Sequence, residues 1–306
     1  MDAIRTERLS RSFGGLVAVN ELSLTVGCGE LFGLVGPDGA GKTTTMRLLA
    51  SIMDPTSGEA WVAGRHTVRE AEAVKERIGY MSQRFGLYAD LTVAENLSFY
   101  ADIYGVARRE LAARTERLLE FSGLGAFRGR LAGNLSGGMK QKLGLACALV
   151  HSPEVLLLDE PTNGVDPVSR REFWRILYGL LREGVTVFVS TAYLDEAERC
   201  ARVGLLHQGR LLACAPPAEV KRLMRGAILE VRAADPRRAA AELREGLGRL
   251  ARSVGLFGDR VHVVTDEAEA ADARIRGVLG EAAATRRIEP SLEDVLVSLT
   301  AANNKS

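Results

Sequence analysis

The chain has 306 residues, of which 46% are hydrophobic and 26% are charged, so it can bury one large core with a smaller second domain. Its 40 basic residues nearly cancel its 39 acidic ones, and we expect no nucleic-acid partner because no overall field favours one. Four scattered cysteines without a C-x-x-C pair predict a reduced, cytosolic chain without structural zinc. The sequence holds no signal-peptide stretch and no uncharged run of the roughly 20 residues that span a bilayer, so any membrane work is expected through a partner.

Strand and helix patterns alternate along the first two thirds of the chain. Residues 22–26 and 31–35 predict a half-exposed and a buried strand, and apolar residues from 42 to 52 recur at helical spacing before a turn. Residues 91–125 predict two amphipathic helices. Further apolar strands follow helical segments at the positions 155–158 and 185–189. This alternation is typical of a doubly wound α/β core with a mainly parallel sheet and a helical insertion.

The pattern changes near Pro216-Pro217, where the chain becomes richer in alanine and arginine. We therefore expect one domain over residues 1–217, with its helical subdomain at about 86–152, and an accessory α+β domain over 218–306. No chemical motif marks the accessory domain. Its strands are expected at 228–231 and 261–264, and its helices at 237–246 and 267–279.

A glycine-rich loop follows the buried strand. The run Gly36-Pro37-Asp38-Gly39-Ala40-Gly41-Lys42-Thr43 matches G-x-x-x-x-G-K-[ST]. Glycines let backbone N–H groups turn inward on a phosphate, Lys42 can reach the β and γ phosphates, and Thr43 can ligate Mg²⁺. We count Thr44 among the nucleotide-binding residues as well. The alternative is a chance glycine-rich turn, and the loop alone does not separate a kinase, a GTPase or a transporter ATPase.

Two carboxylates end the strand at 155–158. Asp159 could hold Mg²⁺ and Glu160 could polarise water. By themselves such residues are more often a solvated strand end or the cap of a turn, here the turn at Pro161. Their weight comes from the phosphate loop upstream.

A serine and two glycines, in Leu135-Ser136-Gly137-Gly138-Met139-Lys140-Gln141, open another predicted helix. Standing alone, Ser136 would be an ordinary helix N-cap. Together with the phosphate loop and the carboxylate pair, this run resembles the signature of ATP-binding-cassette (ABC) ATPases. The resemblance covers residues 3–216 and implies a P-loop NTPase cassette whose mainly parallel core sheet carries an antiparallel β subdomain and a helical insertion.

Three further positions match that family. Phe13 stands where an aromatic ring stacks on adenine, although it would otherwise be a half-buried strand residue. Gln83 resembles the glutamine that contacts Mg²⁺ and the attacking water, and Asp166 resembles a loop that couples two sites across a dimer. Their alternatives are a surface glutamine and an Asp-Pro turn. The resemblance thus assigns catalysis to Glu160, Gln83 and Lys42, and metal binding to Thr43, Gln83 and Asp159.

The resemblance implies a head-to-tail homodimer or heterodimer of cassettes. ATP with Mg²⁺ would lie between the phosphate loop of one subunit and residues 136–138 of the other, so that binding closes the interface and hydrolysis reopens it. Integral-membrane permease subunits would be moved through the segment after Gln83 and the helical insertion. The chain would lie on the cytoplasmic face of the inner membrane.

Some runs resemble particular exporters. Residues 91–97, the Met-Lys-Gln version of the signature and residues 290–295 resemble exporter ATPases of the daunorubicin-resistance type. Residues 163–167 and 191–200 resemble multidrug exporters that act with a periplasmic membrane-fusion protein.

One position departs from the family. Ala192 stands where members carry a histidine that contacts the γ-phosphate, and His66, His151, His207 and His262 all lie elsewhere in the sequence. Tyr193 could offer a hydroxyl in its place, but strand alternation predicts that this side chain points away from the site. Losing one preorganised donor costs about 3 kcal/mol, or about a hundredfold in rate. Because Glu160 remains, slow hydrolysis is expected.

Three hypotheses follow from these motifs. The first is a hydrolytic motor that powers export, and the second is a hydrolysis-impaired module that serves a second, competent cassette. The third, a soluble cassette of translation or DNA repair, is disfavoured. Only 94 positions separate Lys42 from Ser136, which leaves no room for the long coiled coil of repair cassettes, and the chain holds one cassette.

Overall fold

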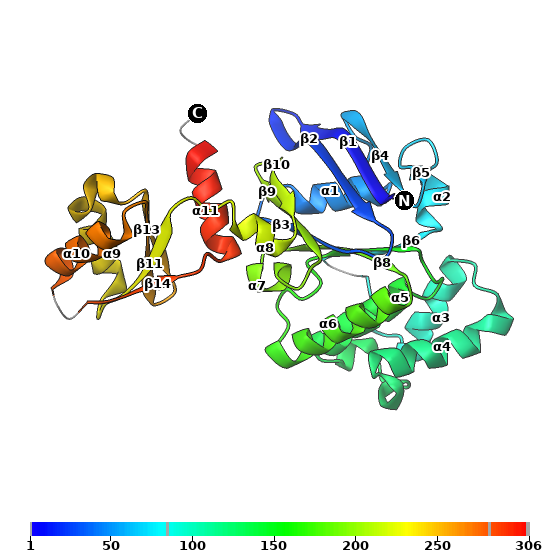
Figure 1. The fold of residues 1–306 in the computed structure, drawn as a ribbon. Coiled ribbons are helices and arrows are strands. Elements are labelled where there is room, and N and C mark those ends of the chain that lie inside the picture. The colour runs from blue at the N-terminus through cyan, green and yellow to red at the C-terminus, as the bar shows by residue number, and fades with distance from the viewer. Residues whose placement is uncertain (1, 84–85, 281–282, 304–306) are drawn as a thin grey trace. The chain divides into compact units, whose positions relative to one another are not determined.

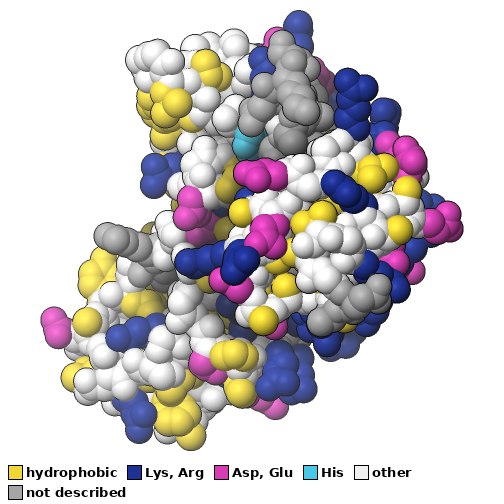
Figure 2. Space-filling view, turned by 90° about the vertical axis from the view of Figure 1, so that its left-hand side faces the viewer, with side chains coloured by type: hydrophobic (Ala, Val, Ile, Leu, Met, Phe, Trp, Pro, Cys, Tyr) yellow, Lys and Arg dark blue, Asp and Glu magenta, His cyan; other side chains and the backbone are white. Residues whose placement is uncertain are grey.

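The computed structural model describes residues 2–83, 86–280 and 283–303. It divides into two compact units, Met1–Pro216 and Pro217–Ser306 (Figure 1). No helix among the described residues is long and apolar enough to cross a membrane. Basic, acidic and hydrophobic side chains are interspersed on the face drawn in Figure 2, in keeping with the near balance of charges.

A six-stranded sheet forms the centre of the first unit, in the order β10-β9-β3-β8-β7-β6. All neighbours run parallel except β10, which is antiparallel to β9. Figure 1 shows α1 on one side of this sheet and α5 and α6 on the other, so the predicted doubly wound core is confirmed. The strands are β3 (Leu31–Val35), β6 (Ile78–Met81), β7 (Val155–Asp159), β8 (Thr186–Thr191), β9 (Arg202–His207) and β10 (Arg210–Ala215).

The carboxyl ends of three central strands meet at one edge of this sheet. β3 leads through the glycine-rich loop into α1 (Lys42–Leu49), while β7 ends at Asp159 and β8 at Thr191. The prediction that the helix extends to Ile52 is wrong, since α1 ends at Leu49 and the side chain of Ile52 is 58% exposed. The apolar side chain at 52 therefore belongs to the following turn.

An antiparallel sheet of order β2-β1-β4-β5 covers one side of the core. Alternating apolar residues of β1 and β2, such as Ile4, Leu9 and Val26, join Phe32 of β3 and Met46 of α1 in one hydrophobic cluster. This packing fixes the β1–β2 hairpin beside the glycine-rich loop. The strands are β1 (Asp2–Phe13), β2 (Leu16–Gly27), β4 (Ser57–Val62) and β5 (Arg65–His66), with α2 (Ala71–Lys75) following.

The two predicted amphipathic helices are α3 (Val93–Ile103) and α4 (Arg108–Ser122). Thr92 and Glu95 form a reciprocal capping box that starts α3. Short 3-10 turns at Gly125–Phe127 and Ala132–Asn134 lead into α5 (Gly137–Ala148). The remaining helices of the unit are α6 (Pro167–Arg182) and α7 (Leu194–Ala197).

The second unit is a four-stranded antiparallel sheet of order β12-β13-β11-β14 with helices. α9 and α10 pack their alanines and leucines on one sheet face, against Val231 and Val263. Gly255, the basic run 286–287 and the polar start of the last helix break the apolar patterning, so the two strands and the helix that contain them were not predicted. The elements are α8 (Pro217–Lys221), β11 (Ala227–Arg232), α9 (Pro236–Gly246), a 3-10 turn (Gly248–Leu250), β12 (Ser253–Phe257), β13 (Arg260–Thr265), α10 (Ala268–Leu279), β14 (Ala284–Ile288) and α11 (Leu292–Asn303), of which α8, the 3-10 turn, β12, β14 and α11 were not predicted.

Candidate nucleotide-binding site

The glycine-rich loop is shaped by close backbone packing. Gly41, the N-cap of α1, has a φ of +106°. A Cβ at this position would lie only 2.2 Å from the carbonyl oxygen of Ala18 in β2, so glycine alone fits. The loop therefore packs closely against the β1–β2 hairpin, and the N-terminus of α1 stays open toward the carboxyl edge of the sheet. Such a terminus is a ready anion site.

Lys42 is held within this loop. Its side chain is only 4% exposed, and Nζ donates to the carbonyls of Gly36 at 2.7 Å and Pro37 at 3.1 Å. Nζ also lies 3.1 Å from Oε1 of Glu160. The ammonium is thus positioned inside the cradle, where a bound phosphate would compete with Glu160 for it.

Asp159 carries an unsatisfied buried oxygen beside Thr43. Oδ1 accepts hydrogen bonds from Ser190 Oγ at 2.7 Å and Thr43 Oγ1 at 3.2 Å, whereas Oδ2 is buried without a hydrogen-bond partner. Burial raises the pKa of this carboxyl above its ordinary value. A carboxylate and a hydroxyl are hard oxygen ligands, so the pair fits Mg²⁺. No group of three His, Cys, Asp or Glu side chains among the described residues could hold a metal, so phosphate oxygens would supply further ligands.

Glu160 is fixed from several directions. Its φ is +48°, an uncommon conformation for a non-glycine residue, and its N–H donates to Ser190 Oγ at 3.0 Å. Its Oε2 accepts from Gln83 Nε2 at 3.1 Å and from Asn163 Nδ2 at 3.4 Å. Unusual backbone conformations of this kind concentrate at functional sites. Here the conformation directs the carboxylate toward the glycine-rich loop rather than into bulk solvent.

A small pocket opens where Ala192 stands. It has a volume of about 240 Å³, and no histidine lines it. The prediction that Tyr193 points away from the site is wrong: its hydroxyl lies 3.3 Å from Asn163 Oδ1. Strand alternation does not apply, because β8 ends at Thr191 and Tyr193 is the N-cap residue of α7. The lining residues are Asp38, Glu160, Thr162, Asn163, Thr191, Ala192 and Tyr193.

The serine-glycine run and Asp166 form a second group. Ser136 is the exposed N-cap of α5 and accepts from the amide of Met139 at 3.3 Å. Asp166 caps α6 in the same way, and hydrogen bonds from Ser169 hold the pKa of its carboxyl below the usual range. Gly138 lets α5 pack closely against α6, since a Cβ at this position would lie 2.3 Å from Ser169 Oγ. Ser136 and Asp166 therefore act as helix caps within this chain, and the N-termini of α5 and α6 lie close together.

Phe13 ends β1 at the tip of the β1–β2 hairpin, where it pairs with Leu16. The side chain is 43% exposed, and the guanidinium of Arg11 lies 4.7 Å above its ring. The hairpin that carries this ring packs on Gly41 of the glycine-rich loop through Ala18. An exposed aromatic face in this place could stack on a planar base.

Comparison with known proteins gives the family. A family model described as ABC transporter matches residues 19–163. The chain is 37% identical over 294 residues to the Nod factor export ATP-binding protein I of Burkholderia lata, covering 95% of each chain. The chain belongs to the ATP-binding proteins of ABC transporters. It is also 52% identical over 228 residues to the probable multidrug ABC transporter ATP-binding protein YbhF of Escherichia coli, an alignment that covers 74% of this chain but only 39% of that relative.

Solved ABC structures share the cassette's fold. An ATP-binding subunit of an ABC transporter is 28% identical, with a TM-score of 0.66 over 72% of this chain and 92% of that one. The cbiO1 protein of Clostridium perfringens, part of the ABC transporter complex cbiONQ, is 27% identical with a TM-score of 0.66, over 72% and 90% of the two chains. The predicted fold class is thereby confirmed.

Sequence reasoning missed several polar residues of the cassette. Ser190 bonds both strand-end acids, yet in the sequence it is only the residue that follows an apolar run. Asn163 follows the carboxylates in a turn, where asparagine is expected for conformational reasons alone. The signal available for Asn163 was its spacing of three from Glu160. For Ser190 there was none, because its role depends on the register of β7 with β8.

Proposed function

We propose that this cassette binds and hydrolyses ATP as the energy-supplying subunit of a bacterial exporter. The observation that carries the proposal is the contact set around Glu160, which meets the phosphate-loop lysine Lys42 on one side and Gln83 on the other. Asp159 and Thr43 lie beside it as oxygen ligands for Mg²⁺. The four groups that phosphoryl transfer needs, a phosphate cradle, a cation ligand, a base and a water-orienting amide, thus meet at one sheet edge.

Binding of ATP would free Glu160 for catalysis. The γ-phosphate draws the Lys42 ammonium away from Glu160 Oε1, which leaves that oxygen to accept a proton from water. Gln83 donates to the other oxygen and can orient the same water from its position after β6. Mg²⁺, held by Thr43 and Asp159, would neutralise charge on the β and γ phosphates. ATP therefore both occupies the cradle and releases the base from its ion pair.

Two copies of the cassette, or this cassette and another, would complete the site. The exposed start of α5, with Ser136, offers N–H groups to an anion. In this proposal that anion is a phosphate bound in the glycine-rich loop of the other subunit, not in the loop of the same chain. A γ-phosphate bridging the loop of one subunit and Ser136 to Gly138 of the other would close the dimer. Its loss after hydrolysis would open the dimer again.

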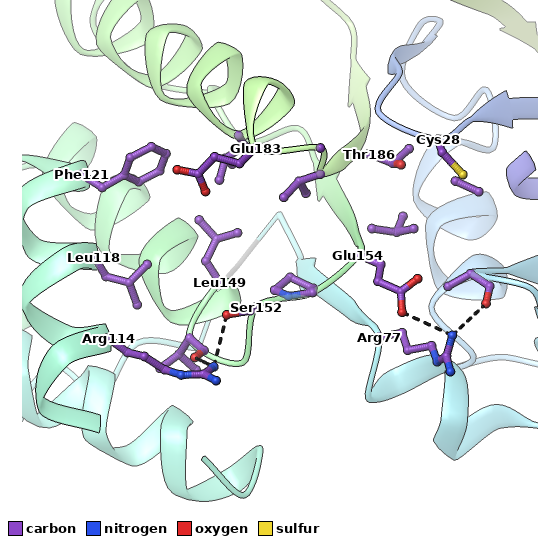
Figure 3. Close-up of a pocket in the computed structure, with 18 of the residues that line it drawn as sticks. Cys28, Arg77, Arg114, Leu118, Phe121, Leu149, Ser152, Glu154, Glu183 and Thr186 are labelled. Atoms are coloured by element: carbon purple, nitrogen blue, oxygen red, sulfur yellow. Dashed lines mark hydrogen bonds and ion pairs between the residues drawn. The ribbon is translucent and has the colours of Figure 1, made fainter. Parts of the chain in front are cut away.

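A larger hollow of about 700 Å³ lies at the opposite edge of the central sheet, beneath α4 (Figure 3). Its walls are apolar, with Leu118 and Phe121 from α4 facing Leu149, and charged side chains surround them (Figure 3). We propose that a cytoplasmic segment of a membrane-embedded permease contacts the helical insertion, to which α4 belongs. Residues 84–85, which begin the segment expected to couple to the permease, lie outside the described residues. The charged rim consists of Arg77, Arg114, Arg117, Glu154 and Glu183.

The relatives support the direction of transport. The names of the two relatives describe multidrug transport and Nod factor export, and the second spans nearly the whole of this chain. On this basis we assign the cassette to an exporter on the cytoplasmic face of the inner membrane. A periplasmic membrane-fusion protein is proposed as a further component from the resemblance of residues 163–167 and 191–200 alone.

A second candidate function rests on Ala192. With no imidazole beside Glu160, the cassette would bind ATP and hydrolyse it poorly, while a second cassette in a heterodimer supplies the competent site. The pocket of about 240 Å³ at Ala192 favours this reading, since it leaves space where a donor to the γ-phosphate would stand.

The decisive experiment compares ATP turnover by the purified full-length chain with turnover by Glu160→Gln and Ala192→His. For a hydrolytic subunit, turnover exceeds the Glu160→Gln background by on the order of a hundredfold. Ala192→His then changes the rate little or raises it. If native turnover equals that background while Ala192→His creates activity, the second candidate is correct. ATP binding by Glu160→Gln, measured by calorimetry, controls for loss of the fold.

A further inference from the structure

We propose that Tyr193, acting through Asn163, is a positioning residue for Glu160. It compensates for the histidine that family members carry at position 192, where this chain has alanine. This inference rests on the proposed hydrolytic function. Tyr193 is not itself in contact with Glu160; the amide of Asn163 lies between them. The three side chains all line the pocket of about 240 Å³ at Ala192.

The hydrogen bonds give the relay a direction. The Tyr193 hydroxyl donates to Asn163 Oδ1 at 3.3 Å, and Asn163 Nδ2 donates to Glu160 Oε2 at 3.4 Å. The ionised carboxylate can only accept, so the amide nitrogen of Asn163 faces Glu160 and its oxygen faces Tyr193, where the phenol donates to it. Without the hydroxyl, the amide loses the donor that holds its oxygen end, and it is held less firmly against Glu160. Both distances are long, as is common for catalytic contacts before substrate binds.

A buried network holds the tyrosine ring. The guanidinium of Arg170 lies 4.4 Å from the centre of the ring, and Arg170 Nε is 3.4 Å from Oε1 of Glu196, whose side chain is 0% exposed. Thr191 Oγ1 accepts from the amide of Tyr193 at 2.9 Å and donates to the other oxygen of Glu196 at 2.9 Å. The backbone and the ring of Tyr193 are therefore anchored to the same carboxylate.

The same carboxylate also anchors the turn that carries Asn163. Thr162, the preceding residue, donates from Oγ1 to Glu196 Oε1 at 2.5 Å. Contacts with the Glu196 carboxylate therefore hold the segments that carry Tyr193 and Asn163, and this fixes the separation of the two side chains. A fixed separation is what a positioning function needs, because a shift of 1 Å near the reacting groups can cost about a hundredfold in rate.

The test is Tyr193→Phe in the full-length chain, which removes the hydroxyl and keeps the ring on Arg170. We expect kcat for ATP to fall about fivefold to tenfold, the effect of one hydrogen bond, with KM unchanged. Tyr178→Phe is the matched control, because the exposed fractions of Tyr178 and Tyr193 are 37% and 36%, and the Tyr178 hydroxyl donates to a backbone carbonyl, that of Arg199.

Two further variants separate positioning from a structural effect. Asn163→Ala should lower kcat as Tyr193→Phe does, and the double variant should be no slower than the slower single variant, since both break one relay. Adding Ala192→His to Tyr193→Phe should restore turnover. If native turnover exceeds that of Glu160→Gln and Tyr193→Phe matches native, the relay is overturned and the proposed function stands. If native turnover equals that of Glu160→Gln, the proposed function fails, and with it any role of the relay in hydrolysis.

Discussion

Two buried carboxylates, one in each unit of the molecule, have opposite surroundings. Asp159 ends β7 with 1% of its surface exposed and one oxygen left without a partner. Asp294 in α11 is 3% exposed, and both of its oxygens accept hydrogen bonds, from His262 and from Ser291. Burial raises the pKa of Asp159. Burial also acts to raise the pKa of Asp294, but the bonds from His262 and Ser291 outweigh it and hold that pKa below the ordinary value.

The difference separates a ligand site from a structural bond. A buried charge without enough partners costs stability, so it persists where a ligand completes it. A buried charge with a full set of partners stabilises the elements it joins, here α11 and β13. Burial alone would have ranked the two aspartates together, whereas the count of hydrogen bonds at each oxygen distinguishes them.

The largest expected effect is on turnover. Asp159→Asn should lower the rate of ATP hydrolysis by about a hundredfold or more, because the cation ligand loses its charge. Asp294→Asn should leave the rate within about twofold, since its partners lie in the other unit. Steady-state phosphate release under saturating ATP and Mg²⁺ measures both. Equal losses in the two variants would contradict the distinction drawn between the aspartates.

The second prediction reverses the roles. Asp294→Asn should lower the free energy of unfolding of the C-terminal unit by about 1.5–3 kcal/mol, since it weakens hydrogen bonds to a charged group. Both tryptophans, Trp61 and Trp174, lie in the first unit. The unfolding transition that their fluorescence reports should therefore keep its urea midpoint. Far-ultraviolet circular dichroism should reveal an earlier transition. A single unchanged transition by both probes would refute the proposed role of Asp294.

The pH dependence of the C-terminal unit follows from the same bonds. Because the folded pKa of Asp294 is depressed, its contribution is complete above the unfolded value, about 3.9, and is lost as pH falls through the folded value. We expect acid unfolding of this unit below about pH 4, and a weaker dependence there in Asp294→Asn. Urea titrations monitored by circular dichroism at several pH values between about 2 and 5 would measure it.

The smallest predicted effect has the opposite sign. Without Mg²⁺, Asp159→Asn should stabilise the first unit by about 0.5–1 kcal/mol, since it removes an incompletely solvated charge. The raised pKa agrees in sign, because a folded value above the unfolded one means that stability falls as pH rises between the two. The midpoint of tryptophan fluorescence on heating, with EDTA present, would measure the shift. A lower midpoint in the variant would show that the bonds from Ser190 and Thr43 outweigh the burial cost.

Much of the fold and the centre of the site could be predicted because spacing in sequence determines local geometry. A strand, a glycine-rich loop and a helix place Lys42 and Thr43 whatever surrounds them. Apolar runs likewise located β7 and β8, and with them Asp159 and Glu160. The C-terminal strands that escaped prediction, β12 and β14, are short and carry exposed or basic residues, so they become extended only through tertiary pairing.

The network around Ala192 could not be predicted from spacing. Tyr193 turns toward Asn163 because β8 ends two residues earlier, and strand ends are the least certain feature of a sequence pattern. Glu196 in a short helix and Thr162 in a turn are brought together only by the folded sheet. Their sequence positions, 34 apart, give no sign of the contact.

Cys28 offers a consequence of a different kind. It lines the hollow beneath α4 and its thiol is exposed (Figure 3). Burial raises the pKa of Cys147 and Cys214, and that of Cys200 to about 12, so these thiols are poor nucleophiles at neutral pH. A maleimide fluorophore should therefore attach at Cys28 first. The native sequence thus carries its own attachment point for an optical reporter of whatever enters that hollow.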